Sequence, residues 1–188
     1  SGFNNLYSSK KQVTALPKTF EADVADFEAK ITKNTKAVIV NSPGNPTGVV
    51  LNQESIETLA HTLTVKAAEY GHPIYLIADE PYRELVYGDT AVPYIPLFYK
   101  NTIVCYSFSK SLSLPGERIG YILVSPEAED AGTVFDAVCG AGRALGYICA
   151  PSLLQKVIAR CTHLRPDLEA YDKNRKALCA KGYNHRIP

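Results

Sequence analysis

A short apolar run leads directly into a cluster of turn residues in the stretch Ala37-Val38-Ile39-Val40-Asn41-Ser42-Pro43-Gly44-Asn45-Pro46-Thr47-Gly48. A continuous apolar run of this length, bounded by turn residues, predicts a strand that is buried on both faces. The prolines, glycines and asparagines that follow it favour a loop, because they fix or permit turn conformations. The stretch therefore predicts a buried strand over residues 37–40 that ends in a loop.

The residues after this loop predict a helix and then a second strand. Asn52 can cap the helix, apolar residues recur behind it at helical spacing, and Gly71 is a suitable end. The run Ile74-Tyr75-Leu76-Ile77-Ala78 predicts another buried strand. Residues 37–78 therefore predict one βαβ unit with a right-handed crossover, which makes the sheet at least partly parallel and the fold α/β.

Two further strands are predicted over residues 102–106 and 119–124. The connection between them is short for a helical crossover, so we allow the fourth strand to be antiparallel. Residues 127–161 are expected to be mainly helical. The breaks expected in that helical region lie at Gly140, Gly142, Gly146 and Pro151.

Composition excludes several kinds of partner. The charges nearly cancel, with 20 Lys and Arg against 19 Asp and Glu, so no overall field would attract nucleic acid or an anionic membrane. No apolar run approaches the ~20 residues that a membrane-spanning helix needs. The five cysteines form no Cys-x-x-Cys pair and have no nearby His at metal spacing, which favours free thiols and no metal site. We expect a cytoplasmic protein with a small-molecule partner.

Polar residues follow three of the predicted strands. They are the segments Asn41 to Asn45, Asp79-Glu80-Pro81-Tyr82 and Ser107-Phe108-Ser109-Lys110. Ligands of open α/β sheets bind outside the carboxyl ends of the strands, so these segments predict a polar pocket. Each segment alone has an ordinary explanation as a turn, a helix cap or a solvated lysine. Only their combination, in this order, indicates a function.

A longer run after the third strand carries a family resemblance. Ser107-Phe108-Ser109-Lys110-Ser111-Leu112-Ser113-Leu114-Pro115-Gly116-Glu117-Arg118-Ile119-Gly120 resembles the lysine signature of the class I and II aminotransferases, which depend on pyridoxal phosphate. Asn45 in Asn-Pro-Thr-Gly and the segment from Asp79 to Tyr82 match two further motifs, in the family's order. The resemblance implies the fold type I of aspartate aminotransferase, with three αβα layers and a mostly parallel mixed sheet.

The resemblance extends over essentially the whole chain, although the chain is shorter than a typical family member. We therefore expect a central fragment. Residues 1–165 would form the central part of the large cofactor-binding domain, and residues 166–188 would begin a truncated C-terminal small domain. The fragment would lack the aromatic residue that stacks on the cofactor, which the family carries in its upstream segment. It would also lack the arginine that grips the substrate carboxylate, which the family carries in its downstream domain, so this fragment alone is expected to be inactive.

The resemblance also assigns roles around the cofactor ring. Lys110 matches the catalytic lysine, which would carry pyridoxal 5'-phosphate as an imine and then move the α-proton of the substrate. Asp79 matches the carboxylate beside the ring nitrogen, which keeps that nitrogen protonated. Asn45 and Tyr82 match the donors to the phenolic oxygen.

To bind the cofactor phosphate, the family pattern supplies the planar, charged guanidinium group of an arginine and several hydroxyl groups. Arg118 matches the arginine of this pattern, and Ser107 matches one of the hydroxyl groups. Ser109 matches a second hydroxyl less closely. The implied reaction is transamination between an amino acid and a 2-oxo acid, in a protein that forms a homodimer at full length. Two alternatives remain. One is another reaction on the same cofactor, such as a carbon–sulfur β-lyase or a decarboxylase, and the other is a non-catalytic effector-binding relative.

The stretch Gly140-Ala141-Gly142-Arg143-Ala144-Leu145-Gly146 gives a different alternative, because it is similar to a dinucleotide-binding loop. Residues 134–139 would be the strand before that loop, and the protein would then be a nicotinamide-dependent dehydrogenase. No βαβ continuation follows the glycines, however. A glycine-rich bend or an interface segment is therefore the favoured interpretation.

Overall fold

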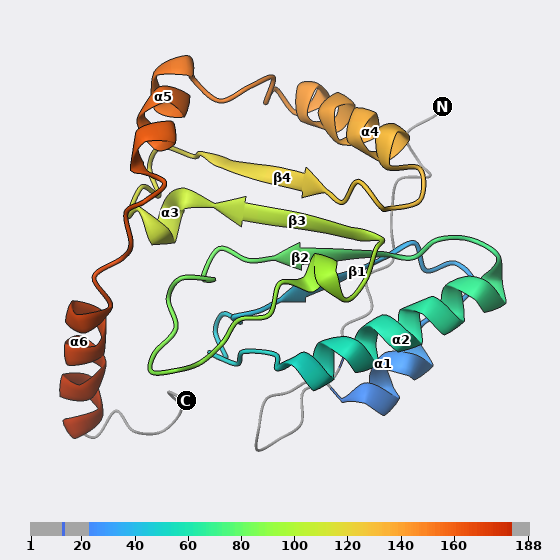
Figure 1. Ribbon diagram of the computed structural model, residues 1–188, viewed down its shortest axis with the longest axis horizontal. Coiled ribbons are helices and arrows are strands. Elements are labelled where there is room, and N and C mark those ends of the chain that lie inside the picture. Colours follow the sequence, from blue (N-terminus) through green and yellow to red (C-terminus); the bar gives the residue numbers. More distant parts are fainter. Residues whose placement is uncertain (1–12, 14–22, 182–188) are drawn as a thin grey trace.

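The computed structural model describes residue 13 and residues 23–181, which contain a four-stranded sheet in the order β1-β2-β3-β4. The strands are β1 Ala37–Asn41, β2 Tyr75–Asp79, β3 Thr102–Ser107 and β4 Gly120–Val124. The first three are parallel, and β4 is antiparallel to β3, as Figure 1 shows. The predicted α/β fold with a mostly parallel mixed sheet is confirmed.

The crossover between β1 and β2 is the helix α2, Gln53–Tyr70. At its start, the Asn52 side chain accepts a hydrogen bond of 2.8 Å from the backbone N–H of Ser55. At its end, Gly71 adopts the left-handed conformation with φ 69°, which glycine reaches without a Cβ clash. Both ends of the helix are those that the sequence predicted, and so is the βαβ unit.

The hydrophobic core lies between the sheet and two helices, α2 and the shorter α1, Val24–Lys30. Figure 1 shows these helices lying together on the side of β1 and β2. The buried side chains of the core include Phe27, Ile56, Leu59, Leu63, Ile74, Leu76, Tyr99 and Val104. Val38 and Val40 pack against this core, whereas Ile39 alternates to the opposite face and is 65% exposed. Burial of β1 is therefore one-sided in the described part of the chain.

The remaining helical elements are short or peripheral. A 3₁₀ turn, η1 Ile95–Leu97, precedes β3, and a single helical turn, α3 Phe108–Ser111, follows it. The chain then forms α4 Ala131–Ala144, α5 Ser152–Cys161 and α6 Leu168–Ala180, which follow one another around the sheet in Figure 1. Within residues 23–181, no helix is both long enough and apolar enough to cross a lipid bilayer.

The helix α4 corrects one prediction. It continues through Gly140 and Gly142, where breaks were expected, because a glycine inside a helix costs only about 1 kcal/mol relative to alanine. The break comes at Gly146, which has φ 87°. Residues 134–139 are helical, so no strand precedes these glycines and the dinucleotide-loop alternative is wrong.

Gly120 should be intolerant of a side chain, because a Cβ there would overlap the backbone carbonyl oxygen of Tyr106. We expect Gly120→Ala to lower the free energy of unfolding by roughly 1–3 kcal/mol, since the clash involves backbone that cannot move aside. Gly116→Ala is the control, because a Cβ there meets no atom within 4 Å. Urea unfolding of the two variants tests this, and equal midpoints would contradict it.

Candidate functional site

The loops that follow β1, β2 and β3 meet at one edge of the sheet, because the three strands are parallel. The strand register places Asn41 beside Asp79, and Asp79 beside Cys105. The residues that continue from these strands therefore start from neighbouring positions. This edge is the carboxyl end of the parallel strands, where the sequence predicted a polar pocket.

Asn41 connects the loops after β1 and β2. Its Nδ2 donates to the Oδ2 of Asp79 at 3.0 Å and to the Asp79 backbone carbonyl at 3.1 Å. Its Oδ1 accepts a hydrogen bond of 2.8 Å from the backbone N–H of Asn45. The Asn45 side chain in turn donates through Nδ2 to the Tyr82 hydroxyl at 2.9 Å. A continuous chain of hydrogen bonds thus runs from Asp79 to Tyr82.

Asn45 contacts the hydroxyl of Tyr82, whereas Lys110 contacts its ring. Its ammonium nitrogen is 5.5 Å from the centroid of the Tyr82 ring, which is a cation–π distance. The turn α3 that carries Lys110 begins directly after β3, and the Ser107 side chain caps it by accepting from the backbone N–H of Ser109 at 3.2 Å. The hydroxyls of Ser107 and Ser109 are also hydrogen-bonded to each other at 2.9 Å.

Asp79 and Ser107 line a common hollow of about 370 Å³ at this edge, together with Cys105, Gly120 and neighbouring residues. Its size lies within the roughly 300–1,000 Å³ of typical small-molecule sites. Burial, and then the nearby Asp79, raise the pKa of the Cys105 thiol, so the thiol stays protonated. The hollow therefore presents one carboxylate and at least one hydroxyl to a ligand.

Arg118 is the candidate residue that this structure keeps apart from the others. Its Nη1 donates to the backbone carbonyl of Pro115 at 3.0 Å, within the same turn, and its backbone is in the left-handed region with φ 51°. The side chain is exposed. No hydrogen bond joins Arg118 to Ser107 in the described part of the chain, so the shared phosphate role of these two residues stays a prediction.

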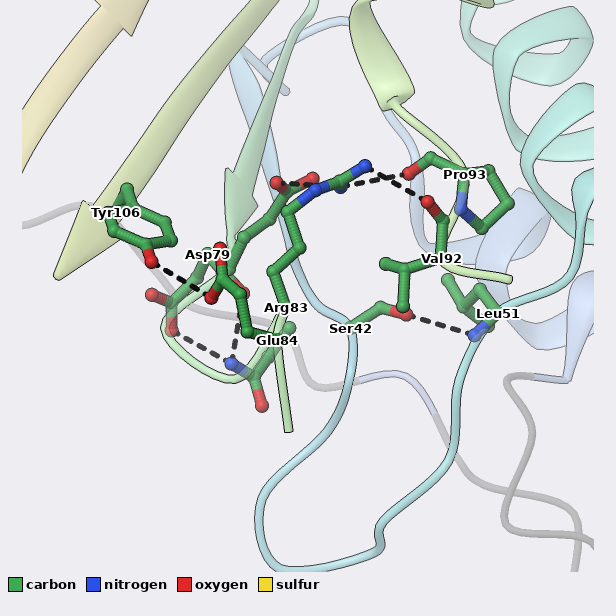
Figure 2. Close-up of polar contacts among 10 residues, drawn as sticks. Ser42, Leu51, Asp79, Arg83, Glu84, Val92, Pro93 and Tyr106 are labelled. Carbon is green, nitrogen blue, oxygen red and sulfur yellow. Dashed lines mark hydrogen bonds and ion pairs between the residues drawn. The ribbon is translucent and has the colours of Figure 1, made fainter. Parts of the chain in front are cut away.

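Beneath the site, a buried ion pair holds the segment that follows Tyr82. Glu80 is only 2% exposed, and its Oε2 accepts from Nη1 of Arg83 at 3.0 Å. Arg83 also donates to the backbone carbonyls of Val92 and Pro93, as Figure 2 shows. Burial raises the pKa of Glu80 despite the opposing effect of Arg83, and its Oε1 has no hydrogen-bond partner among the described residues.

Two features of the site escaped the sequence analysis. The bridging role of Asn41 was one, although an asparagine that ends a buried apolar strand is a usable signal, because its amide must find a partner. The other was the contact between Glu84 and Tyr106, at 2.8 Å from hydroxyl to carboxylate. Neither residue belongs to a motif that the sequence analysis singled out, so no local signal pointed to that contact.

Comparison with known proteins gives a consistent result. The family described as aminotransferase class I and II matches residues 5–181. The YugH protein of Bacillus subtilis (strain 168) is 31% identical over 166 residues, which cover 87% of this chain and 39% of YugH. The aspartate aminotransferase of Pyrococcus horikoshii is 38% identical over 105 residues, which cover 55% of this chain and 25% of that enzyme.

A solved structure gives a similar match. The crystal structure of an amino transferase from Eubacterium rectale is 52% identical and superposes with a TM-score of 0.86. The match covers 89% of this chain and 42% of that protein. The chain therefore spans about two fifths of the length of this protein and of YugH.

Removing the Asn41 amide should loosen this edge of the sheet. We expect Asn41→Ala to lower the free energy of unfolding by about 1–3 kcal/mol, because the change takes a partner from both Asp79 and Asn45. Gln53→Ala is the matched control, since it removes an exposed amide whose one hydrogen-bond partner among the described residues is Glu57. Its effect should stay within about 0.5 kcal/mol. Urea unfolding measures both, and a control loss as large as that of Asn41→Ala would contradict the prediction.

The raised pKa of Glu80 predicts a pH dependence of stability. Because the folded-state pKa lies above the ordinary value of 4.5, the favourable contribution is complete below pH 4.5 and is lost as pH rises through the raised pKa. Glu80→Gln removes this titration. We expect the stability of the wild type relative to Glu80→Gln to fall as pH rises above 4.5.

Urea unfolding at several pH values measures this difference. Glu57→Gln, at an exposed position of α2, is the control and should retain the wild-type slope. A difference between the wild type and Glu80→Gln that does not change with pH would show that Glu80 does not titrate in this way.

Proposed function

Since the chain belongs to the class I and II aminotransferases, we propose that it is the part of a pyridoxal-phosphate-dependent enzyme that holds the cofactor. The proposed reaction moves an amino group between an amino acid and a 2-oxo acid. The position of the Lys110 ammonium over Tyr82, at the end of a hydrogen-bond chain from Asp79, is the observation that carries this proposal.

In the longer protein, we place residues 1–165 in the large domain and residues 166–188 at the start of the small domain, with a second copy of the chain completing a homodimer. The aspartate aminotransferase of Pyrococcus horikoshii, 38% identical over 105 residues, supports an amino acid as the donor.

The side chains at the site fit the chemistry of this cofactor. The Asp79 carboxylate can accept from a protonated ring nitrogen, and it already lines the hollow. The Tyr82 hydroxyl accepts from Asn45, which leaves its own proton free for an oxygen on the ring. The Ser107 and Ser109 hydroxyls can donate to a phosphate. Arg118 would join them if its side chain left the Pro115 carbonyl.

When bound, pyridoxal phosphate supplies an aldehyde that an amine can attack and a ring that withdraws electrons from the breaking bond. Lys110 would attach through its Nζ and, once displaced by the substrate amine, would accept the α-proton of the amino acid on that nitrogen. Tyr82 and Asn45 would hold the ring oxygen, and Asp79 would keep the ring nitrogen protonated. The donors and acceptors present support these roles.

Reductive labelling tests the attachment of the cofactor. After incubation with pyridoxal phosphate and borohydride reduction, we expect the cofactor to be fixed mainly to Lys110, because an amine positioned within a site reacts ahead of solvated amines. Peptide mass spectrometry identifies the labelled residue, and Lys110→Ala should lose this label. The control is Lys33→Ala, at an exposed position between α1 and β1, which should label as the wild type does. Labelling that is spread evenly over the lysines would overturn the proposal.

A further inference from the structure

The hydroxyl of Tyr106 joins two segments that carry proposed cofactor residues. Tyr106 is the penultimate residue of β3, and its hydroxyl oxygen lies 2.8 Å from Oε2 of Glu84 and 2.7 Å from Oγ of Ser111. Glu84 belongs to the turn that follows β2, two residues after Tyr82. Ser111 follows Lys110 directly in α3. Figure 2 shows Tyr106 reaching from its strand toward Glu84.

The direction of these two hydrogen bonds follows from the groups involved. A tyrosine hydroxyl has one proton, and the Glu84 carboxylate can only accept, so Tyr106 donates to Glu84 in a charge-assisted bond. Ser111 then donates its own proton to the Tyr106 oxygen. Burial raises the pKa of Tyr106, which keeps this hydroxyl protonated and the bridge intact in neutral solution.

The Tyr106 ring is itself fixed in place. It stacks on the Tyr121 ring with a centroid distance of 5.0 Å and an interplanar angle of 22°. The Phe108 ring meets it edge-on at 5.2 Å. Ser111 is only 8% exposed, so its hydroxyl has little access to water as an alternative partner. The bridge therefore extends from a side chain that packs against two other aromatic rings.

Lys110 and Tyr82 both lie outside the long elements of secondary structure. Lys110 lies on a helix of four residues, and Tyr82 lies in a turn, so neither is held by a long element of secondary structure. Their own contact is a cation–π interaction at 5.5 Å, which tolerates a wide range of geometries. A hydroxyl that binds both segments at once constrains their separation more closely.

We propose that Tyr106 is a positioning residue that sets Lys110 against Tyr82, through hydrogen bonds of its hydroxyl to Glu84 and Ser111. This inference rests on the proposed function, in which Lys110 carries the cofactor. Tyr106 also lines the hollow beside Asp79, but its hydroxyl is engaged by Glu84 and Ser111. Its effect passes through the two backbone segments on which Tyr82 and Lys110 lie.

The test measures how selectively pyridoxal phosphate labels Lys110. The wild-type chain, three single variants and the Tyr106→Phe/Ser111→Ala double variant are treated with pyridoxal phosphate and borohydride, and label on Lys110 is quantified relative to Lys33 in the same sample. Tyr106→Phe keeps the aromatic cluster but removes the bridge, and Ser111→Ala removes one arm of it. Tyr171→Phe is the control, because it removes an exposed hydroxyl on α6 that makes no hydrogen bond to any residue in the described part of the chain.

We expect Tyr106→Phe and Ser111→Ala each to lower the Lys110:Lys33 ratio roughly fivefold, the factor that one hydrogen bond commonly contributes. The double variant should lose no more than Tyr106→Phe alone, since both changes break the same bridge. Tyr171→Phe should keep the wild-type ratio. Binding of pyridoxamine phosphate, which has no aldehyde, should be unchanged in Tyr106→Phe, whereas general damage to the site would weaken it as well.

Failure of the inference can be distinguished from failure of the proposed function. A wild-type ratio near one would refute Lys110 as the attachment point and remove the basis for both. A high wild-type ratio that Tyr106→Phe leaves unchanged would overturn the positioning role alone. The same holds if labelling and pyridoxamine phosphate binding fall together, because that result indicates a structural role only.

Discussion

The parallel pairing of β1, β2 and β3 ends all three strands at one edge of the sheet, and every contact around Lys110 depends on that edge. The pairing sets Asn41 beside Asp79, which lets one amide bind both the Asp79 carboxylate and the next loop. The turn that continues from β3 then places the Lys110 ammonium against the Tyr82 ring. A shift of one residue in the register would turn Asp79 to the other face of the sheet and break this arrangement.

Much of the fold could be predicted from the sequence because its strongest signals are local. The four strands appear as apolar runs, and α2 begins and ends at residues with specific backbone roles, Asn52 and Gly71. The path of α4 could not be predicted from its glycines, since their intrinsic cost is smaller than the combined preference of the alanine-rich residues around them. The free-energy cost of a glycine identifies a weak point in a helix, but it does not decide whether the helix ends there.

The candidate site was predicted as a set of residues but not as an arrangement. Motif order brought Asn45, Asp79, Tyr82 and Lys110 to attention, and the structure brings these four together. The orientation of Arg118 toward its own turn depends on a backbone conformation that no spacing rule describes. The Asn41 and Tyr106 contacts join residues separated by 38 and 22 positions, so they exist only once the strands have paired.

The four-residue length of α3 has a consequence for the timing of assembly. A single helical turn in water is far below the roughly 12–15 residues at which an isolated helix begins to persist. The position of Lys110 therefore depends on β3, on its antiparallel partner β4 and on the turn after β2. A nascent chain that has emerged only as far as Lys110 contains the Lys110 amine but not β4. The arrangement of Lys110 against Tyr82 is thus complete only after the residues up to Val124 have joined the sheet.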